Sequence, residues 1–422
     1  MLVGLRLAGQ LEHDLLLNKC KTIDKEEKIM LRHFLKLTSA LLLVLGTGTT
    51  NAQSDGIYYA AHHNYRVVEV AEGFLQPWSM AFLPGGDMLV TEKPGRLRIV
   101  RDGKLLPEAV AGIPDVHYVG QGGLFDVVLH PNFAENRWVY ISYAKPIEDT
   151  STTAIIRGRF ENDQLTNVVE IFAAQATGFG HYGGKIAFDG EGYLYLTLGD
   201  RQAPSVGVLT EHPAQDPTNH QGVIVRLNED GSVPDDNPFV GQAGFLPEIW
   251  TYGHRSPQGL AIHPETGDLW ETEHGPQGGD ELNRIEPGNN YGWPVLGYGV
   301  NYGSSGSPIH EGIGRDEMTS PTQLWVPSIA TSGLMIYTGD KFPMWHGSIF
   351  SGALVGEQLA RLHMSDDYRE VIVEEELAYN LGRIRDVRQG LDGYIYIAVS
   401  DGNGGGRGDF VETSIMRLEP ID

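Results

Sequence analysis

The chain has 422 residues, of which 41% are apolar, and a formal net charge of −24 at pH 7. This apolar content supports a large core, and one large β domain accounts for the length as well as several small domains do. The acidic balance argues against nucleic acid and against a stable membrane partner, because both bind clustered lysine and arginine. The ordinary role of such a charge is solubility.

Residues 30–52 have the pattern of a secretory signal rather than of folded structure. A basic segment at 30–36 precedes an apolar segment at 37–45 that is too short to span a bilayer, and small residues follow up to Ala52. We expect cleavage after Ala52, which makes residues 1–52 an N-terminal extension plus signal peptide. The alternative is a membrane anchor.

The remaining residues, 53–422, are expected to form one domain in the periplasm or outside the cell. The only cysteine of the chain, Cys20, precedes them. The mature protein would then have neither a disulfide nor thiol chemistry. Whether it is a monomer or a homodimer is left open by the sequence.

Six times along this part, an apolar strand runs into a proline- or glycine-centred turn and then into a second strand. The repeats lie at 80–90, 128–133, 186–195, 260–270, 334–350 and 387–396. A strand pair that recurs about every 45 to 75 residues is typical of propeller blades. The fifth copy is the weakest. We therefore predict an all-β fold, a six-bladed β-propeller, whose loops bring residues distant in sequence to the mouth of one channel.

Two long stretches between the predicted strands, 202–247 and 294–326, are candidates for the walls of a pocket. Loops of this length in a compact domain are usually functional or contain small elements of their own.

Two polar residues lie in glycine-rich turns directly before predicted blade strands. Gln121, in Gly120–Leu124, presents one amide, and this turn lacks the glycine spacing and the following helix of a dinucleotide-binding loop. His181 follows Gly180, and we expect it to be exposed. With a pKa near neutrality it could take a proton from a substrate hydroxyl. An ordinary loop histidine is the alternative.

Three arginines are candidates for binding an anionic or quinone-like ligand. Arg255, in the constrained stretch 252–259, offers a fixed fork for carboxylate, phosphate or quinone oxygens, or else anchors a loop carboxylate. Arg383 and Arg385 share one face of a predicted strand because side chains alternate with a period of two. An anion between them would relieve their repulsion, and so would Asp386 and its acidic neighbours.

The stretch 271–294 interleaves acidic side chains with glycine and proline. Carboxylate and backbone carbonyl oxygens are the ligands that Ca²⁺ prefers. The spacing is not that of an EF-hand. The alternative is a solvated acidic loop.

These clusters, in this order, resemble the soluble quinoprotein glucose/sorbosone dehydrogenase family, in particular its bacterial aldose sugar dehydrogenases, which use pyrroloquinoline quinone (PQQ). The likeness runs from about Leu75 through Pro420. Its most specific stretches are Gly120–Leu124, 252–259, 273–281, 290–294 and 383–388.

The resemblance implies a role for individual residues. His181 would be the general base and Arg255 would lie beside the quinone carbonyls, so both would be catalytic. The other implied cofactor contacts are Gln121, Tyr302, Ala353, Leu354, Val355, Arg383 and Arg385. The implied calcium ligands are the Glu281 side chain and the backbone carbonyl of Tyr291 for one ion, and the carbonyls of Gly275 and Pro276 for an ion that touches PQQ.

The implied reaction is the oxidation of an aldose at C1 to the lactone. A histidine removes the hydroxyl proton, hydride passes to PQQ, and electrons then go to an external acceptor. Calcium and Arg255 would polarise the quinone. Neither the preferred sugar nor the physiological acceptor follows from the resemblance.

Three positions depart from the glucose-specific branch of the family. Gly180 replaces an acid before the histidine, Ser256 replaces an asparagine, and the strand around Ala353–Val355 lacks a lysine. The first two changes predict a different sugar preference, and the third predicts weaker PQQ binding. A calcium-dependent propeller hydrolase of the lactonase type and a non-catalytic binding propeller are the alternative functions.

Overall fold

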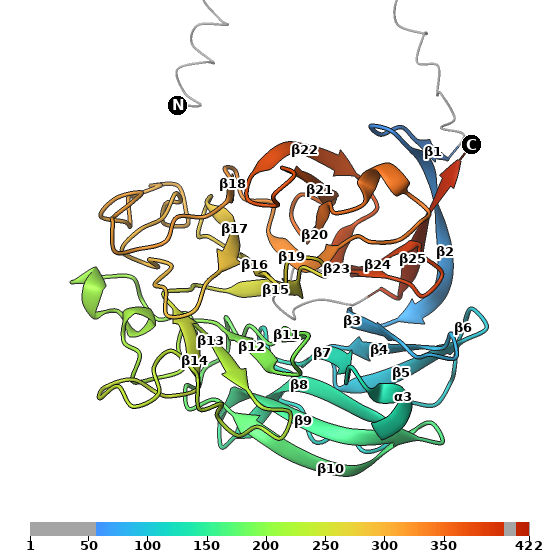
Figure 1. Cartoon of the computed structure of the whole chain (residues 1–422), viewed down its shortest axis with the longest axis horizontal. Helices are drawn as coiled ribbons and strands as arrows, with labels where there is room; N and C mark the ends of the chain where they lie inside the picture. Colours follow the sequence, from blue (N-terminus) through green and yellow to red (C-terminus); the bar gives the residue numbers. More distant parts are fainter. Residues whose placement is uncertain (1–55, 401–410, 422) are drawn as a thin grey trace, which may run out of the picture. The chain divides into compact units, whose positions relative to one another are not determined.

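The computed structural model describes residues 56–400 and 411–421. From Ile57 onward the described chain is nearly all β, and its strands form six antiparallel sheets arranged around one centre (Figure 1). The predicted six-bladed propeller is therefore confirmed. The predicted signal peptide and Cys20 lie outside the described residues. No helix within the described ranges is long and apolar enough to cross a bilayer.

The first three blades follow one another along the chain. Blade 1 consists of β3 (Pro77–Phe82), β4 (Met88–Glu92), β5 (Arg96–Arg101) and β6 (Lys104–Leu105). Blade 2 consists of β7 (Leu124–Leu129), the short helix α3 (Phe133–Asn136), β8 (Trp138–Ile147), β9 (Thr150–Glu161) and β10 (Gln164–Ala173). Blade 3 consists of β11 (Ile186–Phe188), β12 (Leu194–Leu198), the 3₁₀ turns η2 (Leu209–Glu211) and η3 (Pro213–Gln215), β13 (Val223–Leu227) and β14 (Ile249–Tyr252).

The other three blades complete the ring. Blade 4 consists of β15 (Pro257–Ile262), β16 (Leu269–Glu273), β17 (Asp280–Ile285) and β18 (Gln323–Trp325). Blade 5 consists of β19 (Thr331–Ile336), the 3₁₀ turn η4 (Pro343–Trp345), β20 (Ile349–Ala353), β21 (Leu359–Met364) and β22 (Val371–Leu377). Blade 6 consists of β23 (Arg383–Gln389), β24 (Ile395–Ser400), β25 (Thr413–Ile421), β2 (Asn64–Phe74) and β1 (Ile57–Tyr58).

Five of the six predicted strand pairs, including the weak fifth, supply the first two strands of a blade, whereas the second, 128–133, covers only the end of β7, the turn and the start of α3. The first strands, β3, β7, β11, β15, β19 and β23, each contact the next around the ring, and β23 contacts β3 (Figure 1). The apolar core lies between the blades. Between blades 1 and 2, for example, Leu89 and Leu97 pack with Val127 and Ile141. The long stretches 202–247 and 294–326 contain β13 and β18 respectively.

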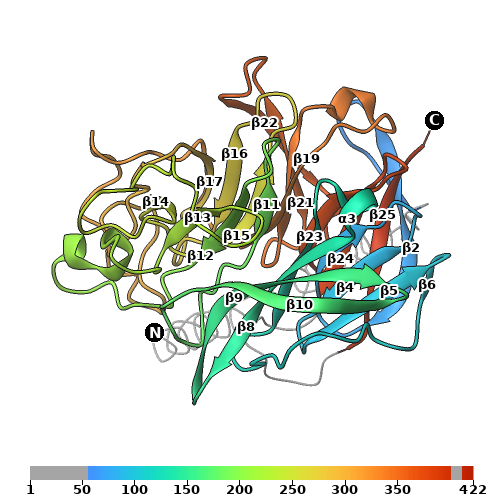
Figure 2. The same cartoon turned by 60° about the horizontal axis from the view of Figure 1, so that its bottom comes forward.

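Blade 6 is closed by the N-terminal part of the domain. Strand β2 pairs antiparallel with the C-terminal strand β25, from Asn64 opposite Ile421 to Phe74 opposite Thr413. Both views show the two strands side by side (Figures 1 and 2). Pairing the two ends of the domain in one sheet ties the ring together, because the last blade cannot separate from the first without breaking this ladder. The sequence analysis did not predict β2.

Four buried or nearly buried charged side chains cross-link the inner strands. Lys185, just before β11, lies 2.8 Å from Asp386 of β23, whose other carboxylate oxygen is 2.9 Å from Arg388 Nε. Arg388 also reaches Asp126 of β7 at 2.8 Å. The backbone N–H of Met80 on β3 donates to Asp386. Two cations thus balance two carboxylates, and strands from four blades share one network.

We expect Asp386→Asn to lower the free energy of unfolding by about 3 kcal/mol. Removing one partner of a buried pair leaves the remaining charge uncompensated, which costs roughly 3–5 kcal/mol, and the amide oxygen of asparagine retains part of the hydrogen bonding. Urea unfolding at neutral pH measures the loss, with the exposed Asp366→Asn as the matched control. A loss no larger than that of the control would contradict the cross-linking role.

Candidate active site

Two adjoining cavities open where the loops at one end of the blades meet. In an antiparallel blade the start of the first strand and the end of the second lie at the same end. The first cavity, of about 280 Å³, is lined by Gln76, Pro77, Trp78, Lys93, Gln121, Phe125, Tyr182, Gly183, Gln258, His274, Ala330, Leu354, Arg383, Arg385 and Ser400. The second, of about 510 Å³, is lined by Gln121, His181, Asp200, Gln202, Ala203, Ser205, Arg255, His274, Pro276, Trp293, Asn301, Tyr302 and Ile309.

Gln121 and His274 line both cavities, so the two lie side by side. The predicted pocket walls also appear here, because Gln202 comes from the stretch 202–247 and Tyr302 from the stretch 294–326. The predicted basic residues therefore line neighbouring cavities: Arg383 and Arg385 line the first, and His181 and Arg255 line the second.

His181 is held by a buried carboxylate. Its Nδ1 lies 2.6 Å from Asp200 Oδ1, and the other oxygen of Asp200 accepts a hydrogen bond from Trp293 Nε1 at 2.8 Å. The backbone N–H of His181 donates to Gln121 Oε1 at 2.7 Å. The expectation of an exposed histidine is wrong, since only 8% of its surface is exposed. Trp293, Asp200 and Gln202 line the second cavity together with it.

The environment keeps the imidazole neutral and the carboxylate charged. Burial lowers the pKa of His181, Asp200 opposes that effect, and the positive charges of Arg255 and Arg201 add to it. Burial would raise the pKa of Asp200, but the interactions with His181 and Arg255 outweigh it, and the pKa is lowered. With its Nδ1 proton donated to Asp200, His181 has Nε2 as a free base. Within the described chain, Nε2 has no hydrogen-bond partner of its own.

Asp200 was missed by the sequence analysis. It follows strand β12 through Gly199, at the blade end where His181 lies in the loop before β11, the first strand of the same blade. A side chain on Gly199 would collide with the backbone of His181, so glycine allows the two segments to approach. A Gly-Asp pair directly after a buried strand, at the end where the histidine lies, is the signal that could have identified it.

Arg255 points toward the loop after β16. Its Nη1 donates to the carbonyls of His274 at 3.0 Å and Gly275 at 2.7 Å, and its guanidinium lies 5.1 Å from the ring centroid of Trp293. Its backbone N–H, rather than its side chain, donates to Glu273. The Arg255 guanidinium thus anchors this loop through backbone carbonyls only. Among the described residues, no carboxylate pairs with the guanidinium.

Arg383 and Arg385 line the first cavity together, as their spacing on a strand predicts. Arg383 Nη1 donates to the Leu354 carbonyl at 2.9 Å, and Arg385 Nη1 donates to Gln258 Oε1 at 3.0 Å. Asp386, the alternative partner, is instead taken up by the buried charge network. Among the described residues no carboxylate lies within ion-pair distance of either arginine. Burial and the charge of Arg383 lower the pKa of Arg385 to about 9.

The remaining predicted cofactor contacts fall into two groups. Tyr302 lines the second cavity and is 67% exposed. Of the three residues at the end of β20, Leu354 lines the first cavity, whereas Ala353 is fully buried and Val355 is exposed. Among the described residues that line this cavity, the stretch 353–355 thus contributes only Leu354.

The four predicted metal ligands line one small cavity of about 10 Å³ beside Arg255. These are Gly275, Pro276, Glu281 and Tyr291. The Gly275 carbonyl already accepts the hydrogen bond from Arg255, so a cation at this oxygen would share or displace it. The space is near the lower limit for one water-sized occupant.

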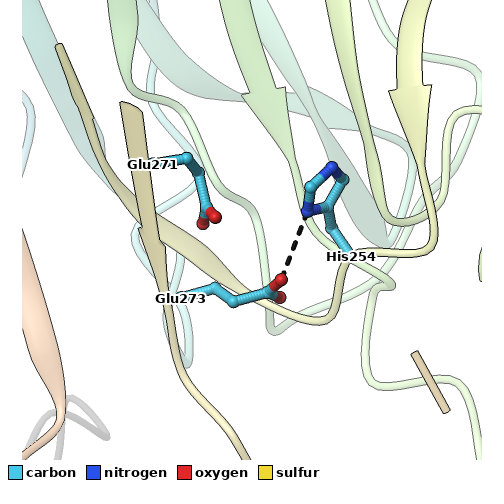
Figure 3. Close-up of side chains that lie close together, drawn as sticks. All are labelled: His254, Glu271 and Glu273. Atoms are coloured by element: carbon cyan, nitrogen blue, oxygen red, sulfur yellow. Dashed lines mark hydrogen bonds and ion pairs between the residues drawn. The ribbon is translucent and has the colours of Figure 1, made fainter. Parts of the chain in front are cut away.

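A cluster of buried acids lies beside this cavity (Figure 3). Ligand atoms of Glu271, Glu273 and His254 all lie within 4.8 Å of one another, and His254 Nδ1 is 3.2 Å from Glu273 Oε1. Glu281 is directly opposite Glu273 in the β16–β17 ladder. Burial first, and then the charge of Glu273, raises the pKa of both Glu271 and Glu281 well above their usual range. Glu271 and Glu273 belong to the acidic stretch of the sequence analysis but were not among its predicted ligands.

The sequence profile of the glucose / sorbosone dehydrogenase family matches residues 74–409. The chain belongs to this family. It is 41% identical over 347 residues to the aldose sugar dehydrogenase YliI of Escherichia coli strain K12, which covers 80% of this chain and 91% of that protein. A crystal structure of a glucose dehydrogenase is 44% identical, with a TM-score of 0.75, and covers 84% of this chain and 98% of that one. The PQQ-bound aldose sugar dehydrogenase of Streptomyces coelicolor is 27% identical, with a TM-score of 0.67, covering 85% and 98%.

As a member of the glucose / sorbosone dehydrogenase family, the protein is an oxidoreductase of the sugar dehydrogenase class. This confirms the predicted family and enzyme class over the hydrolase alternative.

The structure also shows what surrounds the departures from the family pattern. The Gln202 side chain occupies the space into which a side chain at Gly180 would project. Ser256 is buried, with its backbone N–H on Glu273. The Gln202 amide thus takes the space next to Gly180, the position at which the glucose-specific branch is expected to have an acid.

Proposed function

We propose that this glucose / sorbosone dehydrogenase oxidises aldose sugars at C1 to the lactone, with PQQ as cofactor and an external electron acceptor. The observation that carries the proposal is a cation-lined cavity that adjoins a second cavity, into which a carboxylate-oriented histidine presents a free nitrogen. The similarity to a PQQ-bound aldose sugar dehydrogenase supports the choice of cofactor.

The residues of the first cavity fit PQQ, which has three carboxylates and an aromatic ring system. Arg383 and Arg385 would bind carboxylates, because charge-assisted hydrogen bonds from a guanidinium fork are the strongest that side chains offer an anion. Trp78, 5.8 Å from the Arg385 guanidinium, presents an aromatic ring to the same cavity. Gln121 and Arg255 would contact the quinone end, since both line the second cavity.

When bound, PQQ supplies the acceptor for the hydride that leaves C1. His181 Nε2 takes the proton of the C1 hydroxyl, so that the C1–O bond becomes the carbonyl of the lactone. Asp200 keeps the imidazole oriented and stabilises the imidazolium that forms. General base catalysis of this kind contributes roughly 10²- to 10⁴-fold to the rate. Arg255 places a positive charge near the developing charge on the cofactor.

Calcium would bind at the small cavity beside Arg255. The Glu281 carboxylate and the Tyr291 carbonyl would hold one ion and the carbonyls of Gly275 and Pro276 the ion that touches PQQ, and oxygen ligands of this kind suit Ca²⁺. Two further buried oxygens nearby, Glu271 Oε1 and Asn283 Oδ1, lack a hydrogen-bond partner. A divalent cation would neutralise an acidic cluster that otherwise retains protons.

A periplasmic or secreted location completes the proposal, with residues 30–52 as the signal peptide. Electrons would then pass to an acceptor outside the cytoplasm.

Dye reduction by the protein starting at Gln53, with a panel of aldoses and with PQQ and Ca²⁺ added separately and together, tests the proposal. We expect turnover only when both are present, and the panel ranks the sugars. No turnover, together with no spectral change on adding PQQ, would contradict the proposed function.

Calcium should stabilise the protein even without PQQ. A ligand that binds only the folded state adds about 2.7 kcal/mol at a hundredfold excess over its Kd. We therefore expect Ca²⁺ to raise the melting temperature of chelator-treated protein, and Glu281→Gln to lose most of that rise. The exposed Glu317→Gln is the matched control. An equal rise in the Glu281 variant would remove this carboxylate from the metal site.

A further inference from the structure

The first cavity contains a third cation that neither the resemblance nor the sequence pattern identified. Lys93 lies in the turn between β4 and β5 and lines the cavity with Arg383 and Arg385, and it is only 8% exposed. Among the described residues that line this cavity there is no aspartate or glutamate. Burying charge without a partner is costly. Three cations around one space therefore indicate a site made for a polyanion.

Lys93 is held rigidly at this position. Its backbone N–H donates to the Gln76 carbonyl at 3.0 Å, and its own carbonyl accepts from Leu124 N at 2.9 Å. A side chain on Gly123 would collide with Lys93 Cγ and its carbonyl, so only glycine lets this loop close against the lysine stem. The ammonium group donates to the Gly120 carbonyl at 3.1 Å. The side chain is thus positioned before any ligand arrives.

No acid of the described chain pairs with Lys93. Its neighbour Glu92 is occupied by Arg96 at 2.7 Å and Arg98 at 3.2 Å. Burial, followed by the positive charge of Arg385, lowers the pKa of Lys93 to about 8.

None of the other titratable groups described around Lys93 is a carboxylate. Tyr118 has its ring centroid 5.7 Å from the ammonium. Arg383, His274 and Tyr182 line the same cavity. Burial and Arg385 lower the pKa of His274 to about 3, so this imidazole is neutral.

We propose that Lys93 is a cofactor-binding residue whose ammonium pairs with one carboxylate of PQQ, as the third cation beside Arg383 and Arg385. The inference rests on the proposed function and deepens it. Three positive side chains then match three carboxylates. A lysine from blade 1 takes the role of the lysine that the family resemblance led us to expect at 353–355, and the prediction of weaker PQQ binding no longer follows.

Titration of the calcium-loaded protein with PQQ, followed by tryptophan fluorescence, tests the contact without turnover. We expect Lys93→Met to raise the Kd for PQQ roughly 10- to 100-fold, since a hydrogen bond to a charged group has about this strength. Lys93→Arg should recover much of the affinity. Lys104→Met, which removes an exposed lysine of the same blade, should bind like the wild type.

Proton uptake separates a direct contact from a role in holding Gly120. At pH 8 about half of the Lys93 side chains are uncharged before binding, and a carboxylate beside the ammonium raises its pKa. PQQ binding to the wild type should therefore take up about half a proton, measured by calorimetry in two buffers with different ionisation enthalpies. Lys93→Met should lose this uptake, whereas a purely structural lysine would leave it unchanged.

Two outcomes would overturn the inference. An unchanged Kd in Lys93→Met overturns it while leaving the proposed function intact. A wild type that binds no PQQ at all overturns the proposed function as well.

Discussion

Replacing His181 by asparagine is expected to lower kcat by roughly 10²- to 10⁴-fold, the contribution of a general base, and to leave PQQ affinity unchanged. Asparagine can still donate a hydrogen bond to Asp200, so the buried carboxylate keeps a partner and the fold is spared. Nε2, which makes no hydrogen bond to the described chain and faces the second cavity, is lost. Steady-state dye reduction and PQQ titration by fluorescence measure the two effects separately.

The exposed His363→Asn serves as the matched control and should retain full activity. The pH profile gives a second check on the wild type. Because burial lowers the pKa of His181, the base stays unprotonated down to lower pH, and the acid limb of kcat/KM should lie below the usual histidine value of about 6.5. Unchanged kcat in His181→Asn would exclude it as the base.

The fold was predictable from the sequence because each blade repeats a local pattern. A strand such as 194–198, buried on both faces and joined to its neighbour by a tight turn, is visible without knowledge of any distant residue. The pairing of β2 with β25 is different. Their partners are more than 300 residues apart, and β2 alternates burial too irregularly to stand out. Such closure depends on the whole ring rather than on a local segment.

The candidate site was predictable to the extent that single strands or turns encode it. The shared cavity of Arg383 and Arg385 follows from a period of two, and the position of Gln121 follows from its turn. Asp200 and Lys93 depend on which loops meet at the mouth of the ring. The burial of His181 has the same origin, because Asp200, which Trp293 holds, reaches it from another segment. The local sequence around His181 carries no sign of these partners, which lie in other segments of the chain.

The double substitution Arg383→Ala with Arg385→Ala is expected to raise the Kd for PQQ by roughly 10²- to 10⁴-fold. Two hydrogen bonds between charged groups, at about 1.5–3 kcal/mol each, are removed. PQQ titration by fluorescence at saturating Ca²⁺ measures the loss, with Arg369→Ala, an exposed arginine, as the control. An affinity equal to that of the wild type would show that the two guanidinium groups do not bind the carboxylates.

The same substitution should affect the stability of the cofactor-free protein in the opposite direction. Burial and the charge of Arg383 lower the pKa of Arg385 to about 9, and the more distant charge of Asp386 offsets this only in part. Removing both charges removes that strain, so the melting temperature without PQQ should rise or stay constant while affinity falls. A purely structural role would lower both quantities together. A higher melting temperature combined with a lower affinity for PQQ would therefore show that the two arginines destabilise the empty protein and serve to bind an anion. Functional sites often reduce stability in this way.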